Sequence, residues 1–161
     1  MEWRLEHYFL IFVHAVGITA FLCIPRHKRK EAHAVFLFQG MLTWILGLSV
    51  VEAGWLMYPI RELNEASSTS FVFEFLIFPV TAAYYNIFYP ANQPVGKRFA
   101  WLLLFAAGIT LPEYFIERYT DLLEYTGWSW YWTTLSISAT LCISRLFFLW
   151  FFRRGQAYSV Q

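Results

Sequence analysis

Four acidic side chains fall within one aromatic-rich stretch, residues 111–132, which reads LPEYFIERYTDLLEYTGWSWYW. Glu113, Glu117 and Asp121 are spaced at i, i+4 and i+8, so a helix would present them on one face, and Glu124 follows. Glu113 and Glu117 could act as an acid/base pair or hold a divalent cation. Acids at the mouth of an apolar helix are costly unless they are paired or hydrated. We therefore expect this rim to carry whatever function the chain has.

The composition is typical of a membrane protein. Of the 161 residues, 58% are hydrophobic and 14% are charged, against about 45–50% and about 25% in ordinary soluble domains. Aromatic residues make up 22% of the chain. Lipid-facing helices can expose that much apolar surface, whereas a soluble domain of this size could not bury it. No linker divides the chain, so we expect a single transmembrane domain over residues 1–161.

Five apolar runs follow one another along the chain. The expected spans are residues 8–24, 34–58, 71–89, 99–116 and 128–152, and each is long enough to cross about 30 Å of hydrocarbon as a helix. The first run lacks a small-residue cleavage site, so we expect a retained anchor and no signal peptide. The predicted fold class is all-α, an integral membrane bundle of five transmembrane helices.

Lys and Arg residues set the expected orientation, because cytoplasmic loops carry an excess of them. One set of alternate loops holds eight and the other holds three, namely Arg26, Lys28, Arg29, Lys30, Lys97, Arg98, Arg153 and Arg154 against Arg4, Arg61 and Arg118. This split predicts an outside N-terminus and a cytoplasmic C-terminus.

Glycine and proline positions predict how the helices pack. Gly40, Gly47 and Gly54 recur every seven residues, which returns them nearly to one helix face and suits close helix packing. Pro79 should kink the third span and free a backbone carbonyl for a neighbour, and Pro112 should kink the fourth immediately before Glu113.

Placing polar residues by depth, at about 1.5 Å per residue, predicts an outer polar layer. Its expected members are His14, Glu52, Glu74, Glu113 and Glu117, with Arg61 and Arg118 as positive partners. In one interpretation the layer is a clasp of ion pairs that closes the bundle. In the other it is a proton- or cation-binding vestibule, because several buried carboxylates cannot all ionise without compensation. The sequence leaves both open.

An inner polar layer is predicted from Gln39, Asn86 and Arg145. A membrane-embedded Arg costs about 2.5–3.5 kcal/mol on insertion scales. Arg145 therefore either extends to the inner-leaflet phosphates, or bonds Asn86, Gln39 and the carbonyl freed near Pro79, or holds an anionic lipid head.

Enzyme and metal signatures are absent from the sequence. There is no H-E-x-x-H, C-x-x-C, G-x-S-x-G or phosphate-loop motif, and no His stands at Glu-x-x-His spacing. The two cysteines, Cys23 and Cys142, suit neither a disulfide nor a metal site. We expect no catalytic residues, no metal, no cofactor and no nucleic-acid partner.

Several segments resemble a known family. They are YPIRE at 58–62, TSFVFEF at 69–75, FYP at 88–90 and GWSWYW at 127–132. They are similar to a family of small multi-pass membrane proteins from spore-forming Gram-positive bacteria, over nearly the whole chain up to Arg145. That family's pattern has an acid near Glu113, a Glu-x-Tyr-Thr at 117–120 with Arg118 at the variable position, and an Arg near Arg145. The resemblance implies the fold and a bacterial cell membrane, and it implies no activity.

Three functions remain compatible with the sequence. The first expectation is a non-enzymatic structural or assembly component of the cell membrane, related by family resemblance to the spore envelope. The second is a proton- or cation-coupled transport or channel element that uses the outer carboxylates. The third is a small lipid-modifying membrane enzyme. The expected partners are membrane lipid and, through helix packing, other helices or further copies of the chain.

Overall fold

The structure is a computed structural model that describes residues 5–63 and 65–157, with side chains up to residue 152. It is all-helical, with 75% of the residues in helices. The elements in chain order are α1 (Leu5–Leu22), η1 (Arg26–Lys28), α2 (Arg29–Glu52), β1 (Leu56–Met57), η2 (Phe73–Ile77), α3 (Phe78–Ile87), α4 (Val95–Tyr119), β2 (Glu124–Tyr125) and α5 (Trp130–Ala157).

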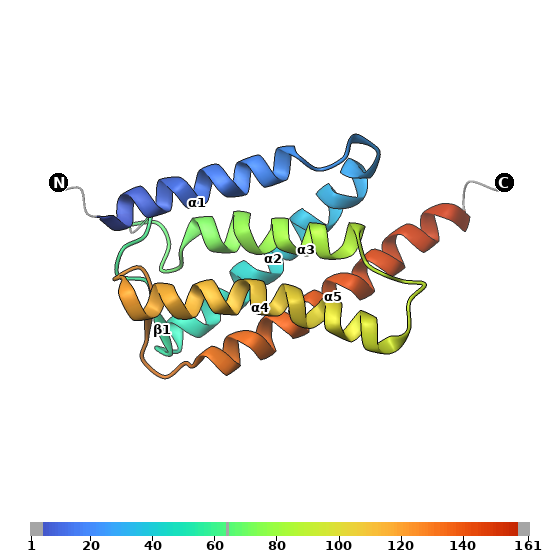
Figure 1. Ribbon diagram of the computed structural model, residues 1–161. Coiled ribbons are helices and arrows are strands. Elements are labelled where there is room, and N and C mark those ends of the chain that lie inside the picture. The colour runs from blue at the N-terminus through green and yellow to red at the C-terminus, as the bar shows by residue number, and fades with distance from the viewer. Residues whose placement is uncertain (1–4, 64, 158–161) are drawn as a thin grey trace.

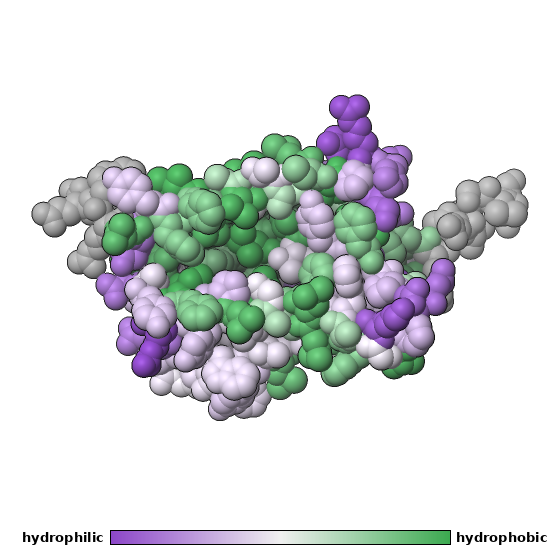
Figure 2. Space-filling model, viewed as in Figure 1, coloured by the Kyte–Doolittle hydropathy of each residue, from purple (hydrophilic) through white to green (hydrophobic). Residues whose placement is uncertain are grey.

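Among the described residues, four helical segments are long and apolar enough to cross a membrane: α1, η1 with α2, α4, and α5. Their outward faces carry large, exposed apolar side chains. Phe12 on α1 is 62% exposed, Leu37 on α2 70% and Leu104 on α4 61%. Figure 2 shows hydrophobic side chains over the middle of one face and hydrophilic ones gathered toward the two ends. Such a surface suits contact with lipid. The length and apolar surface of the helices therefore indicate a membrane protein.

The long helices run back and forth between two ends of one bundle (Figure 1). We call the end that holds β1 and β2 the capped end and the end that holds η1 the basic end. At the basic end, Lys28 donates to the carbonyl of Ile87 at 2.6 Å and Arg29 Nε to that of Ile24 at 3.4 Å. These cations satisfy carbonyls where α3 and α1 stop, as basic residues commonly do at helix C-termini. Arg4 and the side chains of Arg153 and Arg154, which also set the expected orientation, lie outside the described residues.

The third helical segment, residues 71–87, contains a π-helical turn where a proline kink was expected. The amide of Phe78 bonds the carbonyl of Phe73, five residues earlier. The next such bond would come from residue 79, but Pro79 has no N–H to give to the carbonyl of Glu74. The Thr43 hydroxyl of α2 takes that place, 2.9 Å from the Glu74 carbonyl oxygen. The freed carbonyl is therefore satisfied by α2, and not by Arg145 as one of the expectations had it.

The second helix ends at Glu52, six residues before the end expected from its apolar run. Gly54 stops it, since its φ of 71° is a left-handed conformation that suits glycine after a helix. Leu56 and Met57 then form β1, which pairs antiparallel with β2 in the register Leu56 to Tyr125.

The β1–β2 pair ties two loops together into a cap. The amides of Thr126 and Gly127 both donate to the carbonyl of Trp55, at 3.1 and 2.9 Å. The rings of Trp55 and Trp128 stack over this junction with centroids 6.3 Å apart. Leu122 and Leu123 are buried beneath it. The cap therefore covers the end of the bundle at which the acidic side chains collect.

Candidate functional site

Glu113 lies in the last third of α4 and is held by two hydroxyl groups. The Tyr125 hydroxyl donates to its Oε1 at 2.7 Å and the Thr133 hydroxyl donates to the same atom at 2.6 Å. The indole of Trp128 in turn donates to the Thr133 oxygen at 2.8 Å. Three elements meet here, because Tyr125 comes from β2 and Thr133 from the first turn of α5. Glu113 is thus positioned by neutral donors from the cap and from the neighbouring helix.

Tyr125 is protonated when it makes this contact. Burial raises the pKa of its phenol above the ordinary value, and the negative charge of Glu113 raises it further. A phenol with a raised pKa keeps its proton at neutral pH and so donates it to the carboxyl group. The described contacts to Glu113 therefore both bring hydrogen to Oε1, whichever charge state the carboxyl group is in.

Glu74 lies in the π-helical turn, and it is 3% exposed. Its carboxyl group is pressed against Gly47 of α2, where an added Cβ would collide with Oε1. Gly40 instead faces the ring of Pro79, 3.4 Å from an added Cβ, and Gly54 has open space around it. The expected glycine stripe therefore has two packing members, and one of them, Gly47, makes room for a carboxyl group.

The two carboxyl groups line one cavity of about 80 Å³, which we call the carboxyl cavity. Its other polar lining comes from the indole of Trp128 and from hydroxyl side chains, namely Thr43, Tyr58, Thr133, Ser136 and Thr140. A cavity of this size has room for more than one water molecule, and these groups offer the several polar partners that a buried water needs. Two carboxyl groups in one low-dielectric space cannot both ionise without compensation, so the cavity can take up a proton or a small cation.

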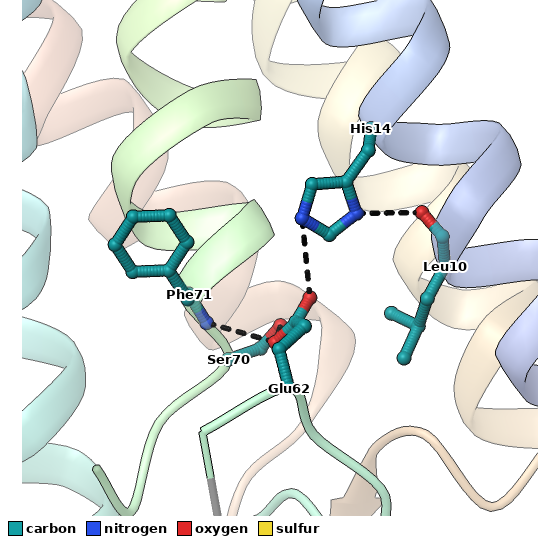
Figure 3. A network of polar contacts seen from close by, with 5 residues as sticks. All are labelled: Leu10, His14, Glu62, Ser70 and Phe71. Carbon is teal, nitrogen blue, oxygen red and sulfur yellow. Dashed lines mark hydrogen bonds and ion pairs between the residues drawn. The ribbon is translucent and has the colours of Figure 1, made fainter. Parts of the chain in front are cut away.

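His14 and Glu62 form a second polar contact, at the junction of α1 and the cap (Figure 3). His14 Nδ1 lies 2.8 Å from the Leu10 carbonyl, which can only accept, so Nδ1 carries a hydrogen. The other nitrogen, Nε2, lies 4.0 Å from Glu62 Oε1. Glu62 Oε2 accepts from the amide of Phe71 at 3.1 Å and from Ser70 at 3.2 Å, which caps the third helical segment. His14 thus belongs to this contact and does not line the carboxyl cavity.

The remaining residues of the expected outer layer lie elsewhere. Glu52 is exposed at the end of α2, where it accepts from Ser68 at 2.9 Å. Glu117 is half-buried one turn beyond Glu113, and Arg118 is exposed. Arg61 donates to the carbonyls of Ser67 and Tyr58, at 2.6 and 2.7 Å. The outer layer is therefore not one cluster.

The helical face of acids expected from residues 113–121 is also shorter than its spacing suggests. The helix α4 ends at Tyr119, so Asp121 falls in the cap and not on the face that carries Glu113 and Glu117. Asp121 and Glu124 are both exposed there.

The inner polar residues lie toward the basic end. Asn86 donates its amide to the Ser144 hydroxyl and to the Ala82 carbonyl, both at 2.9 Å. Arg145 lies over the ring of Tyr89, 4.2 Å from its centroid, and donates to the Asn86 carbonyl at 3.4 Å. Gln39 is buried, and its Oε1 has no partner among the described residues. Arg145 therefore contacts backbone and aromatic rings, an arrangement known to stabilise a desolvated guanidinium.

Sequence reasoning missed three residues of this site: Tyr58 and Thr43, which line the carboxyl cavity, and Tyr125, which donates to Glu113. The two tyrosines lie in segments that read as loop or as the end of a span, and only the β1–β2 pairing brings them over the acids. Thr133 stood in the polar run of the fifth span, which did signal a helix turned toward the bundle interior.

Neither a metal site nor a relative identifies this cavity. Among residues 5–63 and 65–157, no group of three or more His, Cys, Asp or Glu side chains could hold a metal ion. Both cysteines are exposed and free. No family model matches the chain, and no curated protein or solved structure matches it either.

Proposed function

We propose that this chain is a non-enzymatic, five-span protein of the bacterial cell membrane whose carboxyl cavity takes up a proton or a small cation from the outer side, as part of a transport or channel element. One observation carries the proposal: Glu74 and Glu113 line the same cavity of about 80 Å³, and the described hydrogen bonds to Glu113 come from neutral hydroxyls. A structural clasp would instead pair these acids with arginines. The Nε and Nη1 atoms of Arg61, an expected partner, donate to backbone carbonyls and not to these acids.

The proposed orientation puts the capped end outside. Basic residues that the sequence assigns to the cytoplasm, including Lys28 and Lys97, lie in η1 and at the start of α4, which Figure 1 shows at one end of the bundle. Residues 71–87 are then a fifth membrane span in addition to the four long helices. Their length is at the lower limit of the about 17–25 residues that a span needs.

Topology gives the first prediction. In a chain with Cys23→Ser and Cys142→Ser, a cysteine placed at Ala66 should react with a membrane-impermeant maleimide on intact cells, and one placed at Asn92 should not. Both positions are exposed, and they lie at opposite ends of the bundle. After the membrane is permeabilised, Asn92→Cys should react as well, which shows that the site is accessible. Labelling of Asn92→Cys on intact cells contradicts the orientation.

Ion movement gives the second prediction. Purified protein in liposomes that contain a pH-sensitive dye should acidify the lumen after an external acid step, and Glu113→Gln should reduce the rate to that of protein-free liposomes. The amide keeps the shape and still accepts from Tyr125 and Thr133, but it does not titrate. Glu52→Gln is the matched control, because Glu52 is exposed outside the cavity. A rate that Glu113→Gln leaves unchanged contradicts the proposal.

A structural or assembly component, the first expectation from the sequence, is the second candidate here, and the cap favours it. Trp128 lines the cavity and stacks on Trp55 at the β1–β2 junction, so the cap covers part of the cavity, as a stabilising polar core would require. The two candidates differ in the effect of Glu113→Gln on the thermal unfolding midpoint. A stabilising core loses a charge-assisted hydrogen-bond network and melts earlier, whereas an ion-binding pair is relieved of like-charge repulsion and is as stable or more so.

A further inference from the structure

A second cavity, of about 300 Å³, lies between α1 and α4 with the π-helical turn at its base. We call it the α1–α4 slot. Its volume is at the lower end of the about 300–1,000 Å³ of small-molecule sites. The walls are almost wholly apolar, with Phe9, Phe12, Val13, Phe73, Phe78 and Ile116 among the lining residues. In Figure 1, α3 is seen between α1 and α4.

The slot opens on the side of the bundle. Phe12 and Val16 on its α1 wall are 62% and 48% exposed, and Gly108 and Pro112 on its α4 wall are exposed as well. From Gly108 to Ile116 it follows α4 for about 12 Å at 1.5 Å per residue. That length is close to one leaflet, half of the about 30 Å hydrocarbon core. A hydrocarbon chain can therefore enter from the bilayer and lie along the slot.

The polar side chains that line the slot lie at its capped end, and the carboxyl group among them accepts hydrogen bonds. Glu113 and Tyr58 line both this slot and the carboxyl cavity. Glu74 lies in that cavity too and adds a second acid behind them. Farther along, Pro112 has no N–H to give to the carbonyl of Gly108, four residues earlier on the same wall. These groups are complementary to a ligand head group that donates hydrogen bonds and carries a positive charge. A phosphate head group would instead be repelled by the carboxylates.

We infer that the α1–α4 slot binds a cationic amphiphile, with one hydrocarbon chain between α1 and α4 and an amine head at Glu113. This inference deepens the proposed function, because it gives the same carboxyl group a ligand that reaches it from the bilayer. The inference requires that the Glu113 carboxyl group, at the wall between the two cavities, can contact a ligand in the slot. It does not require that protons or ions cross the membrane.

Binding of radiolabelled dodecylamine to the purified protein in phosphatidylcholine nanodiscs tests the inference. An amine paired with a carboxylate gains a charge-assisted hydrogen bond that dodecanol lacks, and dodecanoate meets repulsion. We therefore expect dodecylamine to bind at least about tenfold more tightly than dodecanoate, with dodecanol in between. Equal affinity for dodecylamine and dodecanoate overturns the inference, as does the absence of saturable dodecylamine binding.

Two glycines of α4 supply matched variants. A Cβ at Gly108 or at Gly96 has nothing within 4 Å, so both should accept a larger side chain, but only Gly108 lines the slot. Gly108→Leu should abolish dodecylamine binding and Gly96→Leu should leave it unchanged. Val16→Phe should fill the slot from the α1 wall, and it replaces Gly108→Leu in the test if that variant does not fold. Binding that survives in a folded slot-filling variant overturns the inference.

The two proposals fail in distinguishable ways. Glu113→Gln should remove the preference for dodecylamine over dodecanol while dodecanol still binds, because the apolar walls are unchanged. Gly108→Leu should abolish amphiphile binding and leave the titration of the carboxyl cavity intact. Wild-type protein that binds dodecylamine saturably but shows no proton flux contradicts the proposed function alone. Wild-type protein that shows proton flux but no saturable dodecylamine binding contradicts this inference alone.

Discussion

We expect Gly47→Ala to lower the thermal unfolding midpoint, although the same change at most helix positions raises it. Alanine is worth about 0.5–1 kcal/mol more than glycine inside a helix. At Gly47, however, the added Cβ collides with Glu74 Oε1 and approaches its Cδ to 2.7 Å. Glu74 is 3% exposed, so its carboxyl group can yield only by moving within the carboxyl cavity and leaving its place against α2. Overpacking costs about 1–3 kcal/mol, which we expect to exceed the gain in helix propensity. The measurement is thermal unfolding of the purified protein in detergent, followed by circular dichroism.

The control and the rescue for this substitution both come from the structure. Gly108→Ala meets nothing within 4 Å and should be neutral or slightly stabilising. Combining Gly47→Ala with Glu74→Ala removes the colliding atoms, so the double variant should be more stable than the sum of the single effects predicts. Additive effects, or a Gly47→Ala variant as stable as Gly108→Ala, would show that the Glu74 carboxyl group does not lie against α2.

Thr133→Val gives the second large effect. The hydroxyl of Thr133 is buried, donates to Glu113 and accepts from the indole of Trp128. Valine keeps the shape and removes both interactions. A buried polar group left without its partner costs about 1–3 kcal/mol, and here two groups lose one each. We expect a clear fall in the unfolding midpoint together with a change in Trp128 fluorescence.

Ser138→Ala is the matched control for Thr133→Val. The Ser138 hydroxyl also lies on α5, but it donates to the carbonyl of Thr134 in its own helix, at 2.7 Å. Its removal strands no group on another element and should shift the midpoint little. Equal effects of the two substitutions would mean that Thr133 does not join α5 to α4 through Glu113.

The helical class and the membrane character follow from the sequence because they depend on composition and run length. The apolar content and the long runs near α1, α2, α4 and α5 require nothing beyond the energy of placing apolar side chains in lipid. The residue at which the second helix ends could not be predicted from composition and run length. Leu56, Met57 and Tyr58 continue the apolar run, and only the left-handed Gly54 and the pairing with β2 separate them from the helix.

The candidate site was predictable in part. Depth alone placed Glu74 and Glu113 near one another, since both lie a similar number of turns from the capped end. Depth does not fix the rotation of a helix about its axis, so it could not separate these two from Glu52, which is exposed. It also could not foresee the π-helical turn, which sets the direction of Glu74, or the β1–β2 pairing, which brings Tyr125 to Glu113.

Infrared titration of the carboxyl groups tests most directly whether Glu74 and Glu113 act as one titrating pair. Two carboxyl groups in one low-dielectric cavity should not both ionise, so wild-type protein near neutral pH should show a protonated-carboxyl band. We expect the band to vanish or shift in both Glu74→Gln and Glu113→Gln, and to persist unchanged in Glu52→Gln. A wild-type spectrum without such a band near neutral pH, or a band that both cavity substitutions leave unaltered, would contradict the account.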